Sequence, residues 1–355
     1  MLRKIVVITG PYVIPSIYYG GIQRIVHLLC SGLSEQGIEV DLLAGTGSST
    51  YSGRTYTYRH QKPTLQSRLY RRLAFQATAI RAALDRADLI HSFVMWPEYH
   101  GLLHALNLPI LFTQQNTAAA DDWERIVKVN QSRSFYIGIS QDQISSVQGL
   151  PPERSTVIGN ATDFNLIRPV ADPSGAYLAF LGRLSHDKGV DLAIRLSLAT
   201  GIPLKIAGII PHEEKGADQF FHEHVAPYLS RSGIEYIGEI DDGAKSTFLG
   251  NALALLMPNR WREPFGIVMV EALAAGTPVI GSNLGSIPEL VEHGQTGFIC
   301  DSFEAFVEAI RRVHQLDRTI CRTSGERRFS KSVFIQAHLD FYASALAMLS
   351  PRRGL

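Results

Sequence analysis

The chain has 355 residues, and 45% of them are hydrophobic, which is enough to build two globular domains with a core in each. The formal net charge at pH 7 is +1, so we expect no overall positive field that would attract nucleic acid. The cysteines at positions 30, 300 and 321 have neither metal-ligand nor redox-motif spacing, which favours a reducing, cytoplasmic setting without disulfides. We also expect no stretch as long as a transmembrane helix.

The first apolar run, at residues 5–8, predicts a buried strand. Basic residues precede it, as in a secretory signal, but the run is too short and breaks at Gly10. Gly20 and Gly21 then lead into an amphipathic helix that Gly37 closes. A glycine pair between a strand and a helix lets the backbone approach a ligand closely, although such pairs are also ordinary in turns.

Residues 54–86 form a basic segment in which Asp85 is the single acid. From residue 65 onward the pattern predicts a helix whose apolar face excludes Arg68, Arg71 and Arg72. These arginines could make a weak peripheral contact with the inner face of a membrane or bind an anionic acceptor. A solvated helix face is the more common meaning of such a charge pattern.

Short apolar runs continue through the first half and predict strands at residues 88–93, 109–113, 136–140 and 155–158. The second of these runs is followed by Gln115, whose amide donates and accepts hydrogen bonds but takes up no proton. His91 lies in the first run. It could face a ligand at the strand end or be a buried histidine with satisfied hydrogen bonds, and the sequence leaves both explanations open.

A linker rich in proline, aspartate, serine and glycine, residues 168–175, separates the two halves. The second half again alternates strands and helices, which predicts an α/β fold with parallel sheets. Its first strand ends at Gly182 and is followed by Arg183 and Lys188 at the start of a helix. A guanidinium fork and an ammonium at a helix N-terminus favour a diphosphate. The loop lacks the glycine spacing of a nicotinamide-binding fingerprint.

Residues 252–281 predict a strand, a loop, a helix and a second strand, with Pro264 in the first helical turn and Gly276 at the helix end. The loop carries Glu263, and the helix carries Glu271 eight positions later. Carboxylates accept hydrogen bonds from hydroxyl groups, so the pair suits a ligand that carries hydroxyls. An isolated helical glutamate is more often solvated.

The backbone N–H groups of Phe265, Gly266 and Ile267, between the two glutamates, are expected to favour an anion. The pattern E-x7-E, with Phe-Gly after the first glutamate, resembles the donor-sugar motif of the retaining glycosyltransferases of family 4. Residues 182–188 match the G-R-x4-K motif of that family. Residues 285–299 are similar to its C-terminal signature, and the glycine pair at 20–21 is similar to its first loop.

The resemblance implies a GT-B architecture, with two Rossmann-like domains that face each other across a cleft. We expect an N-terminal acceptor domain at residues 1–168 and a C-terminal nucleotide-sugar domain at residues 169–335. The resemblance also implies that the last helix, residues 336–350, returns to the N-terminal domain.

The implied activity is transfer of a sugar from a nucleoside diphosphate sugar, with the anomeric configuration retained. UDP-sugars are the first expectation and GDP-sugars the second, and the acceptor stays unnamed. By this resemblance Glu263 holds the sugar hydroxyls and Glu271 the ribose diol. Arg183 and Lys188 stabilise the charge on the departing diphosphate.

Other positions take their expected roles from the same resemblance. Gly20 and Gly21 would face the diphosphate, and the backbone of Ile240 would lie beside the nucleobase. Gln115 stands where many members have a histidine near the reacting sugar, which leaves an acid–base role there in doubt. No metal is implied, because Asp121-Asp122 and Asp241-Asp242 lack the Asp-x-Asp spacing of the metal-dependent transferases.

Two alternatives remain. A nucleotide-sugar epimerase on the same fold is one, and the E-x7-E pattern argues against it. A catalytically silent subunit that only binds a nucleotide sugar is the other, and Gln115 and Ala161 leave room for it.

Overall fold

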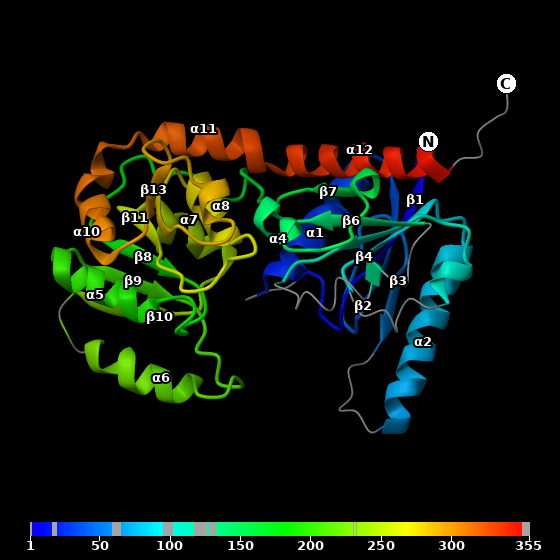
Figure 1. The fold of residues 1–355 in the computed structure, drawn as a ribbon, viewed down its shortest axis with the longest axis horizontal. Helices are drawn as coiled ribbons and strands as arrows, with labels where there is room; N and C mark the ends of the chain where they lie inside the picture. Colours follow the sequence, from blue (N-terminus) through cyan, green and yellow to red (C-terminus); the bar gives the residue numbers. More distant parts are fainter. Residues whose placement is uncertain are drawn as a thin grey trace. The chain divides into compact units, whose positions relative to one another are not determined.

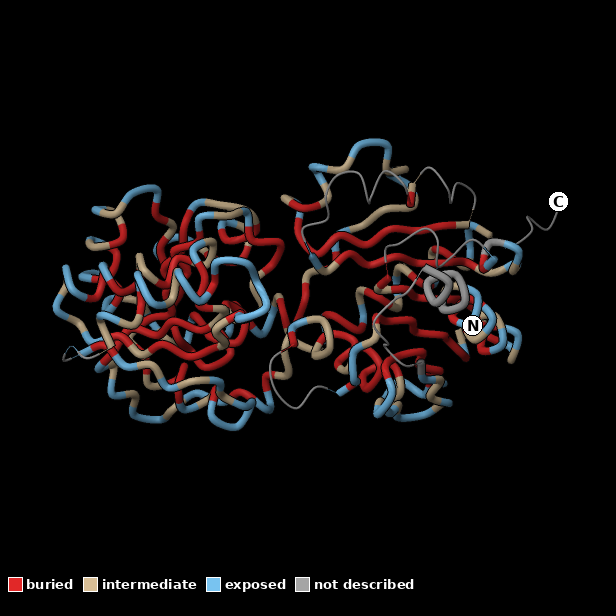
Figure 2. The backbone as a smooth tube through the Cα atoms, turned by 90° about the horizontal axis from the view of Figure 1, so that it is seen from below, coloured by how far each residue is buried: buried red, intermediate tan, exposed pale blue. Residues whose placement is uncertain are grey.

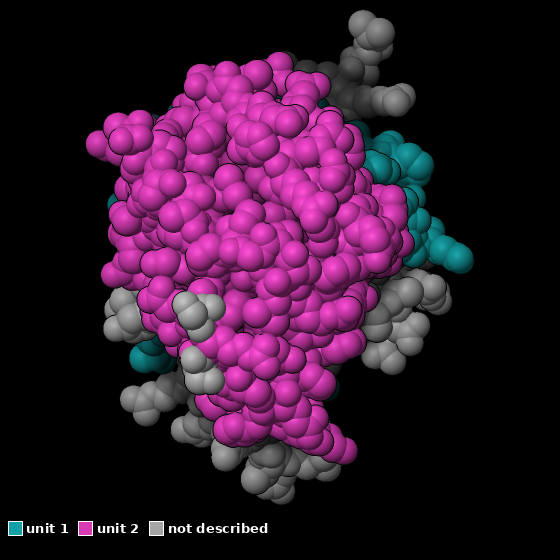
Figure 3. Space-filling model, turned by 90° about the vertical axis from the view of Figure 1, so that its left-hand side faces the viewer, with its two compact units in different colours: residues 1–16, 20–160, 331–355 teal, residues 17–19, 161–330 magenta. Residues whose placement is uncertain are grey.

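The computed structural model describes residues 2–15, 20–58, 65–94, 102–116, 126–127, 133–229, 231 and 233–349. The chain forms two compact units (Figure 3). Unit 1 contains residues 1–16, 20–160 and 331–355, and unit 2 contains residues 17–19 and 161–330. Each unit is described by itself below.

Unit 1 is built on a parallel sheet whose strands lie in the order β3-β2-β1-β4-β5-β6-β7. Its strands are β1 (Lys4–Ile8), β2 (Glu39–Gly45), β3 (Thr55–Tyr58), β4 (Leu89–Ser92), β5 (Ile110–Thr113), β6 (Ser134–Gly138) and β7 (Ser155–Val157). Its helices are α1 (Gly21–Glu35), α2 (Leu65–Leu84), η2 (Leu103–Ala105), α4 (Gln141–Ser145), η3 (Pro152–Arg154) and α12 (Lys331–Leu349).

Unit 2 is built on a second parallel sheet, in the order β10-β9-β8-β11-β12-β13. Its strands are β8 (Leu178–Leu181), β9 (Leu204–Ala207), β10 (Ile234–Gly238), β11 (Ala254–Met257), β12 (Val279–Ser282) and β13 (Gly297–Cys300). Its helices are α5 (Val190–Thr200), α6 (Ala217–His224), η4 (Ala226–Tyr228), α7 (Asp242–Gly250), α8 (Ile267–Ala274), α9 (Ile287–Leu290), α10 (Phe303–Arg312), η5 (Val313–Gln315) and α11 (Arg318–Phe329).

The strands form the cores of both units because their apolar runs are covered on both faces. Helices flank the strands in Figure 1, and Figure 2 shows the strands as mostly buried chain with exposed residues on the surrounding helices and loops. All five residues of β1 are buried, as are all four of β8 and β11. Parallel strands joined by crossover helices are typically covered in this way. The predicted α/β class with parallel sheets is confirmed.

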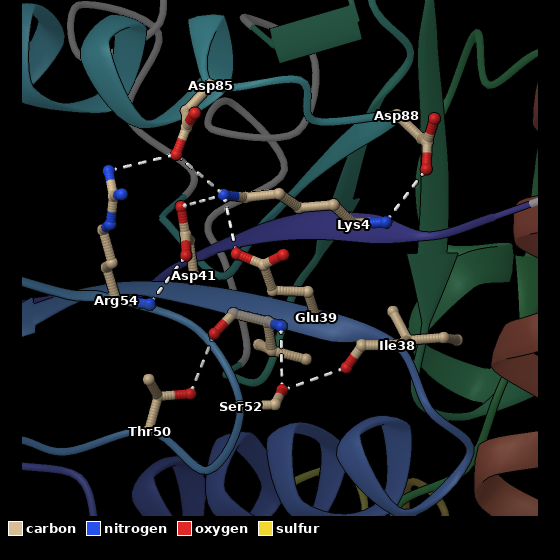
Figure 4. A network of polar contacts seen from close by, with 10 residues as sticks. Lys4, Ile38, Glu39, Asp41, Thr50, Ser52, Arg54, Asp85 and Asp88 are labelled. Carbon is tan, nitrogen blue, oxygen red and sulfur yellow. Dashed lines mark hydrogen bonds and ion pairs between the residues drawn. The ribbon is translucent and has the colours of Figure 1, made fainter.

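A charged network fixes the amino-terminal ends of β1 and β2 (Figure 4). The ammonium of Lys4 lies 2.9 Å from Glu39 and 3.1 Å from both Asp41 and Asp85. Burial by itself would lower the pKa of Lys4, but the hydrogen bonds to these three carboxylates outweigh it and raise the pKa. Asp88 accepts hydrogen bonds from the N–H groups of Arg3 and Lys4. The network therefore has a structural role in the register of the sheet.

The structure divides the chain at 160 and 330, whereas the sequence analysis placed the boundaries at 168 and 335. Residues 161–168 pack with unit 2 because the guanidinium of Arg322 donates to the carbonyl groups of Phe164 at 2.9 Å and Ile167 at 3.1 Å. The last helix begins at Lys331, which extends its contact with unit 1 through an ion pair with Glu35 at 2.6 Å.

One further local expectation differs from the structure, and the elements β3 and α11 were not predicted. β3 has only four residues, and α11 is mostly polar with little apolar periodicity. α8 begins at Ile267 and not at Pro264, because Gly266 has a φ of 75° and its left-handed backbone cannot continue a right-handed helix.

α12 is long and apolar enough, by length and composition alone, to cross a bilayer, although the sequence analysis expected no such stretch. One helix of this kind is weak evidence for a membrane span, because the core helix of a globular domain passes the same test. In unit 1 this helix buries His338 and Tyr342 against the sheet side of the domain, and the Tyr342 hydroxyl is hydrogen-bonded to His91 at 2.7 Å.

Candidate active site

The candidate site lies at the carboxyl-terminal edge of the unit 2 sheet. All strands of this sheet are parallel, so the loops that follow β8, β9, β10, β11 and β12 meet at one edge. Open parallel sheets bind their ligands at this edge. The predicted donor residues from Arg183 to Glu271 are all in or directly after these loops.

Glu263 forms the centre of the loop between β11 and α8. It is 5% exposed, and its Oε2 accepts hydrogen bonds from the Lys188 ammonium at 2.5 Å and from the Asn259 amide at 2.7 Å. The Lys188 ammonium also lies 4.6 Å from the centre of the Trp261 ring, a cation–π contact. Within the described residues no hydrogen bond reaches Oε1 of Glu263, so this oxygen keeps its acceptor capacity.

Glu271 forms a second pair with a lysine. It lies in α8 and is 2% exposed, and its Oε1 accepts a hydrogen bond from the Lys245 ammonium at 2.5 Å. Lys245 comes from α7 and is itself 6% exposed. Glu271 is therefore not the solvated helical residue that isolated glutamates usually are. Each glutamate of the E-x7-E motif is buried beside one lysine.

Arg183 follows β8 and lies at a more exposed position than Lys188. Its guanidinium pairs with Asp187 at 3.4 Å and with Glu214, which is in the loop after β9. Both partners are partly exposed, so these pairs are screened by water and contribute little to folding. An anionic ligand at the loop would compete with the two carboxylates for the arginine.

Arg260 connects the loop that carries Lys188 to the loop that carries Glu263. Its guanidinium binds both carboxylate oxygens of Asp191, each at 2.7 Å, and donates to the carbonyl of His186 at 2.9 Å. Its backbone N–H donates to the carbonyl of Asp187 at 2.8 Å. Burial alone would raise the pKa of Asp191, but the hydrogen bonds and charge of Arg260 outweigh it and lower the pKa. Through these contacts Arg260 holds Lys188 next to Glu263.

The backbone around Glu263 is fixed by the loop after β12. A Cβ atom on Gly285 would lie 2.4 Å from the Glu263 nitrogen, so only glycine permits this approach. Ser286 donates from its N–H to the Glu263 carbonyl and from its hydroxyl to the Phe265 carbonyl, each at 2.9 Å. Two adjacent loops therefore set the position of the glutamate side chain.

The remaining predicted donor residues are in unit 2 but differ in exposure. Phe265 is 3% exposed and packs edge-on against Phe329, so its side chain belongs to the core. Gly266 caps the N-terminus of α8, where the N–H groups of the first turn, starting at Ile267, lack helical partners. Ile240 is half-buried and follows β10. All four positions are at the edge where the nucleotide is predicted to bind.

The residues predicted in unit 1 are at the start of α1 and around β4 and β5. Gly20 caps α1, and Gly21 is its first residue. His91 is fully buried, with Nδ1 bonded to the Tyr342 hydroxyl and Nε2 to the Thr113 hydroxyl, each at 2.7 Å. Burial lowers the pKa of His91 well below its usual value, and both nitrogens are used. The geometry favours the satisfied core histidine over a ligand contact.

Gln115 follows β5 and pairs with Asn160, which follows β7. The Gln115 amide donates to Asn160 at 3.0 Å and accepts from it at 2.8 Å. This reciprocal amide pair orients Gln115 without any group that titrates near neutral pH. A hydrogen-bonding role toward a sugar stays a prediction.

The described residues contain no group of three or more histidine, cysteine, aspartate or glutamate side chains that could hold a metal ion. The side chains of Arg68 and Arg71 lie outside the described residues, and Arg72 is half-buried on α2.

The cysteines at positions 30, 300 and 321 are free and buried, and burial raises the pKa of each thiol to about 12.

Comparison with protein families agrees with this geometry. The family described as "Glycosyl transferases group 1" matches residues 166–327, and "Glycosyltransferase Family 4" matches residues 19–166. The chain belongs to the family 4 glycosyltransferases. The predicted family is thereby confirmed.

Similar proteins come from several bacteria. A glycogen synthase of Mycobacterium tuberculosis is 28% identical over 352 residues, with 84% of this chain and 82% of the relative covered. Among solved structures, a glycosyltransferase from Rickettsia africae has a TM-score of 0.78 at 15% identity and covers 97% of this chain and 99% of its own. HepE from Anabaena, in complex with UDP and glucose, has a TM-score of 0.76 at 16% identity and covers 97% and 100%. The glycosyltransferase therefore has the predicted GT-B fold.

Three residues of the glycosyltransferase site were missed by the sequence analysis, namely Lys245, Asn259 and Arg260. Asn259 is four positions before Glu263, but it is not part of the motif that resembles the family. Lys245 and Arg260 are ordinary surface residue types in the sequence. Only their tertiary contacts, with Glu271 and Asp191, identify them.

Proposed function

We propose that this glycosyltransferase transfers a sugar from a nucleoside diphosphate sugar to an acceptor and retains the anomeric configuration. The observation that carries the proposal is the pair of buried carboxylates, Glu263 and Glu271, each 2.5 Å from a lysine at the carboxyl edge of one parallel sheet. Such a site offers acceptors for hydroxyl groups and cations for phosphates within one domain.

The proposed roles follow from charge development during transfer. The bond between the anomeric carbon and the diphosphate oxygen breaks, and negative charge gathers on the diphosphate. Lys188 and Arg183 are the cations that stabilise this charge, and Glu263 holds the hydroxyls of a ring that becomes positive. The acceptor oxygen forms the new bond, and its proton passes to the departing diphosphate. These cations make a metal ion unnecessary in the proposal.

For the nucleotide, Glu271 is the proposed partner of the ribose diol, and Ile240 lies beside the base. UDP-sugars are favoured as donors, and the HepE complex with UDP and glucose supports this choice. GDP-sugars are the second candidate. By the family resemblance, Gly20 and Gly21 keep their proposed role toward the diphosphate, and Gln115 keeps its proposed contact with a sugar. A peripheral membrane contact through the basic helix and a cytoplasmic location complete the proposal.

A binding subunit without catalysis is the alternative from another functional class. Gln115 and Ala161 leave room for it, because they stand where many family members have a histidine and a glycine. The alternative predicts donor binding without release of the nucleoside diphosphate. An epimerase is disfavoured by the E-x7-E pattern, and its product would be a nucleotide sugar and not a free nucleotide.

One experiment separates these functions and addresses the acceptor. The purified protein is incubated with UDP-sugars and GDP-sugars in turn, with and without an extract of its host. Released nucleoside diphosphate is measured, and mass spectrometry identifies any glycosylated product. Transfer predicts nucleotide release together with a product heavier by one sugar. Donor binding without release would favour the silent subunit, and a changed sugar on an intact nucleotide would favour the epimerase.

A further inference from the structure

Lys245 is a buried lysine that none of the motifs includes. Its side chain leaves α7 toward α8, where the ammonium lies 2.5 Å from Oε1 of Glu271 and 3.3 Å from Asp242. The lysine is 6% exposed and Glu271 only 2%. A buried ammonium is costly unless a carboxylate neutralises it and accepts its hydrogen bonds. The two groups therefore form one charged unit in the interior of unit 2.

The second oxygen of the same carboxylate is different. Oε2 of Glu271 is buried, and no donor among the described residues makes a hydrogen bond to it. A carboxylate can accept about four hydrogen bonds, and a buried acceptor without a donor raises the free energy of the folded state. The Lys245 contact engages one oxygen and leaves the other with unused capacity. A hydroxyl donor at Oε2 would remove this cost.

The pair also connects two parts of the nucleotide site. α7 follows the loop of Ile240, and its first turn is capped by Asp241, which accepts from the N–H of Ala244 at 2.8 Å. α8 follows the loop of Glu263. Lys245 thus links the helix after the proposed base-binding loop to the glutamate proposed to bind the ribose.

We propose, on the basis of the proposed function, that Lys245 is a positioning residue that sets specificity for ribose over 2′-deoxyribose. It holds Oε1 of Glu271 and fixes the carboxylate, so that Oε2 accepts a hydrogen bond from a ribose hydroxyl. Lys245 itself does not contact the nucleotide. Its removal leaves a carboxylate that can rotate, and then the ribose hydroxyl loses its acceptor.

A purely structural role makes a different prediction. If the pair only joins α7 to α8, its loss lowers thermal stability and leaves the preference for ribose intact. A direct contact of Lys245 with phosphate or base makes a third prediction. In that case the affinities for ribose and 2′-deoxyribose nucleotides fall by the same factor.

Calorimetry with UDP, GDP and ADP, and with the 2′-deoxy form of each, tests the proposal. The variants are Lys245→Met, Lys245→Arg, Glu271→Gln and Lys245→Met combined with Glu271→Gln. Lys205→Met is the matched control, because Lys205 is also a paired lysine of unit 2 but is on β9, with its side chain 38% exposed and 3.2 Å from Glu235. Thermal unfolding of each variant is recorded beside the binding data.

Wild type is expected to bind the ribose form about tenfold or more tightly than the 2′-deoxy form, the effect of one hydrogen bond to a charged group. In Lys245→Met this ratio should fall close to one, mainly through weaker binding of the ribose form, and Lys245→Arg should restore part of it. In the Glu271→Gln background, Lys245→Met should change neither affinity, because the two residues act as one unit.

An unchanged ratio in Lys245→Met, or an equal loss for both forms, would overturn the proposal. If Lys245→Met does not fold, the double variant decides, because it contains no unpaired carboxylate. Weaker binding by the double variant than by Glu271→Gln would then show a direct contact of Lys245 with the ligand and refute the positioning role. Failure of wild type to bind any of the nucleotides would refute the proposed function itself, which distinguishes the two failures.

Discussion

Replacement of Lys188 by methionine tests the charge arrangement at the centre of the site. The ammonium lies 2.5 Å from Glu263 Oε2 and is the proposed partner of the departing diphosphate. Methionine keeps most of the side-chain volume and removes the charge. We expect kcat to fall by two to three orders of magnitude, or roughly 3–4 kcal/mol, as for loss of one charge-stabilising donor.

The contact between Lys188 and Glu263 makes the effects of the two residues dependent on each other. Each single variant, Lys188→Met and Glu263→Gln, is expected to lose about 10²–10³ in kcat. Independent effects would multiply to about 10⁴–10⁶ in the double variant. Because the lysine also holds the carboxylate, we expect the double variant to lose little more than the worse single variant.

The assay is release of nucleoside diphosphate under saturating donor, with Lys205→Met as the control for loss of a paired lysine outside the site. Control turnover should equal that of wild type. The reasoning is refuted if Lys188→Met has near-normal turnover, or if the losses of the single variants simply multiply. The first result would remove the diphosphate role, and the second would remove the coupling.

Four further outcomes are expected. Gly285→Ala should lower turnover at least tenfold by displacing the Glu263 backbone, with donor binding as the accompanying measurement. Arg260→Gln should lower kcat by about tenfold while thermal unfolding changes little, since a partly exposed brace contributes modestly to stability. Activity should persist in excess chelator, and loss restored by magnesium or manganese would show a missed metal site. Burial lowers the pKa of His338 to about 4, so His338 should contribute roughly 3 kcal/mol to the loss of stability as the pH drops from about 6.5 toward 4, and the total loss should be smaller in His338→Gln.

The sign of this pH effect follows from proton uptake. Buried His338 and His91 stay neutral in the folded protein, because desolvation lowers the pKa of each below the unfolded value. The unfolded chain therefore binds more protons below about pH 6.5, and acid favours unfolding. Thermal unfolding midpoints of wild type and His338→Gln with the same pH dependence would contradict this origin.

The parallel α/β organisation was predictable because buried strands appear in the sequence as short apolar runs between turn residues. The strand of Ala254–Met257 and the helix that carries Glu271 follow such a pattern directly. Local polar elements were not predictable. β3 and α11 are stabilised by contacts with neighbouring elements. The start of α8 was predicted at Pro264, but the left-handed backbone at Gly266 places it at Ile267.

Among the side chains of the site, too, some were predictable from the sequence and others were not. Motifs placed Arg183, Lys188 and the two glutamates at one sheet edge, because loops after parallel strands must meet there. The partners that bury and orient them were not visible, since Lys245 is 26 positions from Glu271 and shares no pattern with it. For His91 the sequence left a ligand contact and a satisfied buried histidine both open, and its two hydrogen bonds inside unit 1 favour the second.

The most direct test of the central claim is a proton NMR time course of donor hydrolysis by the wild-type protein. A UDP-sugar with an α-linked sugar is supplied without acceptor, and the anomeric signal of the released sugar is followed before mutarotation. Retaining transfer chemistry predicts that the α-anomer appears first, and that Glu263→Gln releases it at least a hundredfold more slowly. First appearance of the β-anomer would contradict retention, and equal rates for the two proteins would contradict the role of the glutamate site.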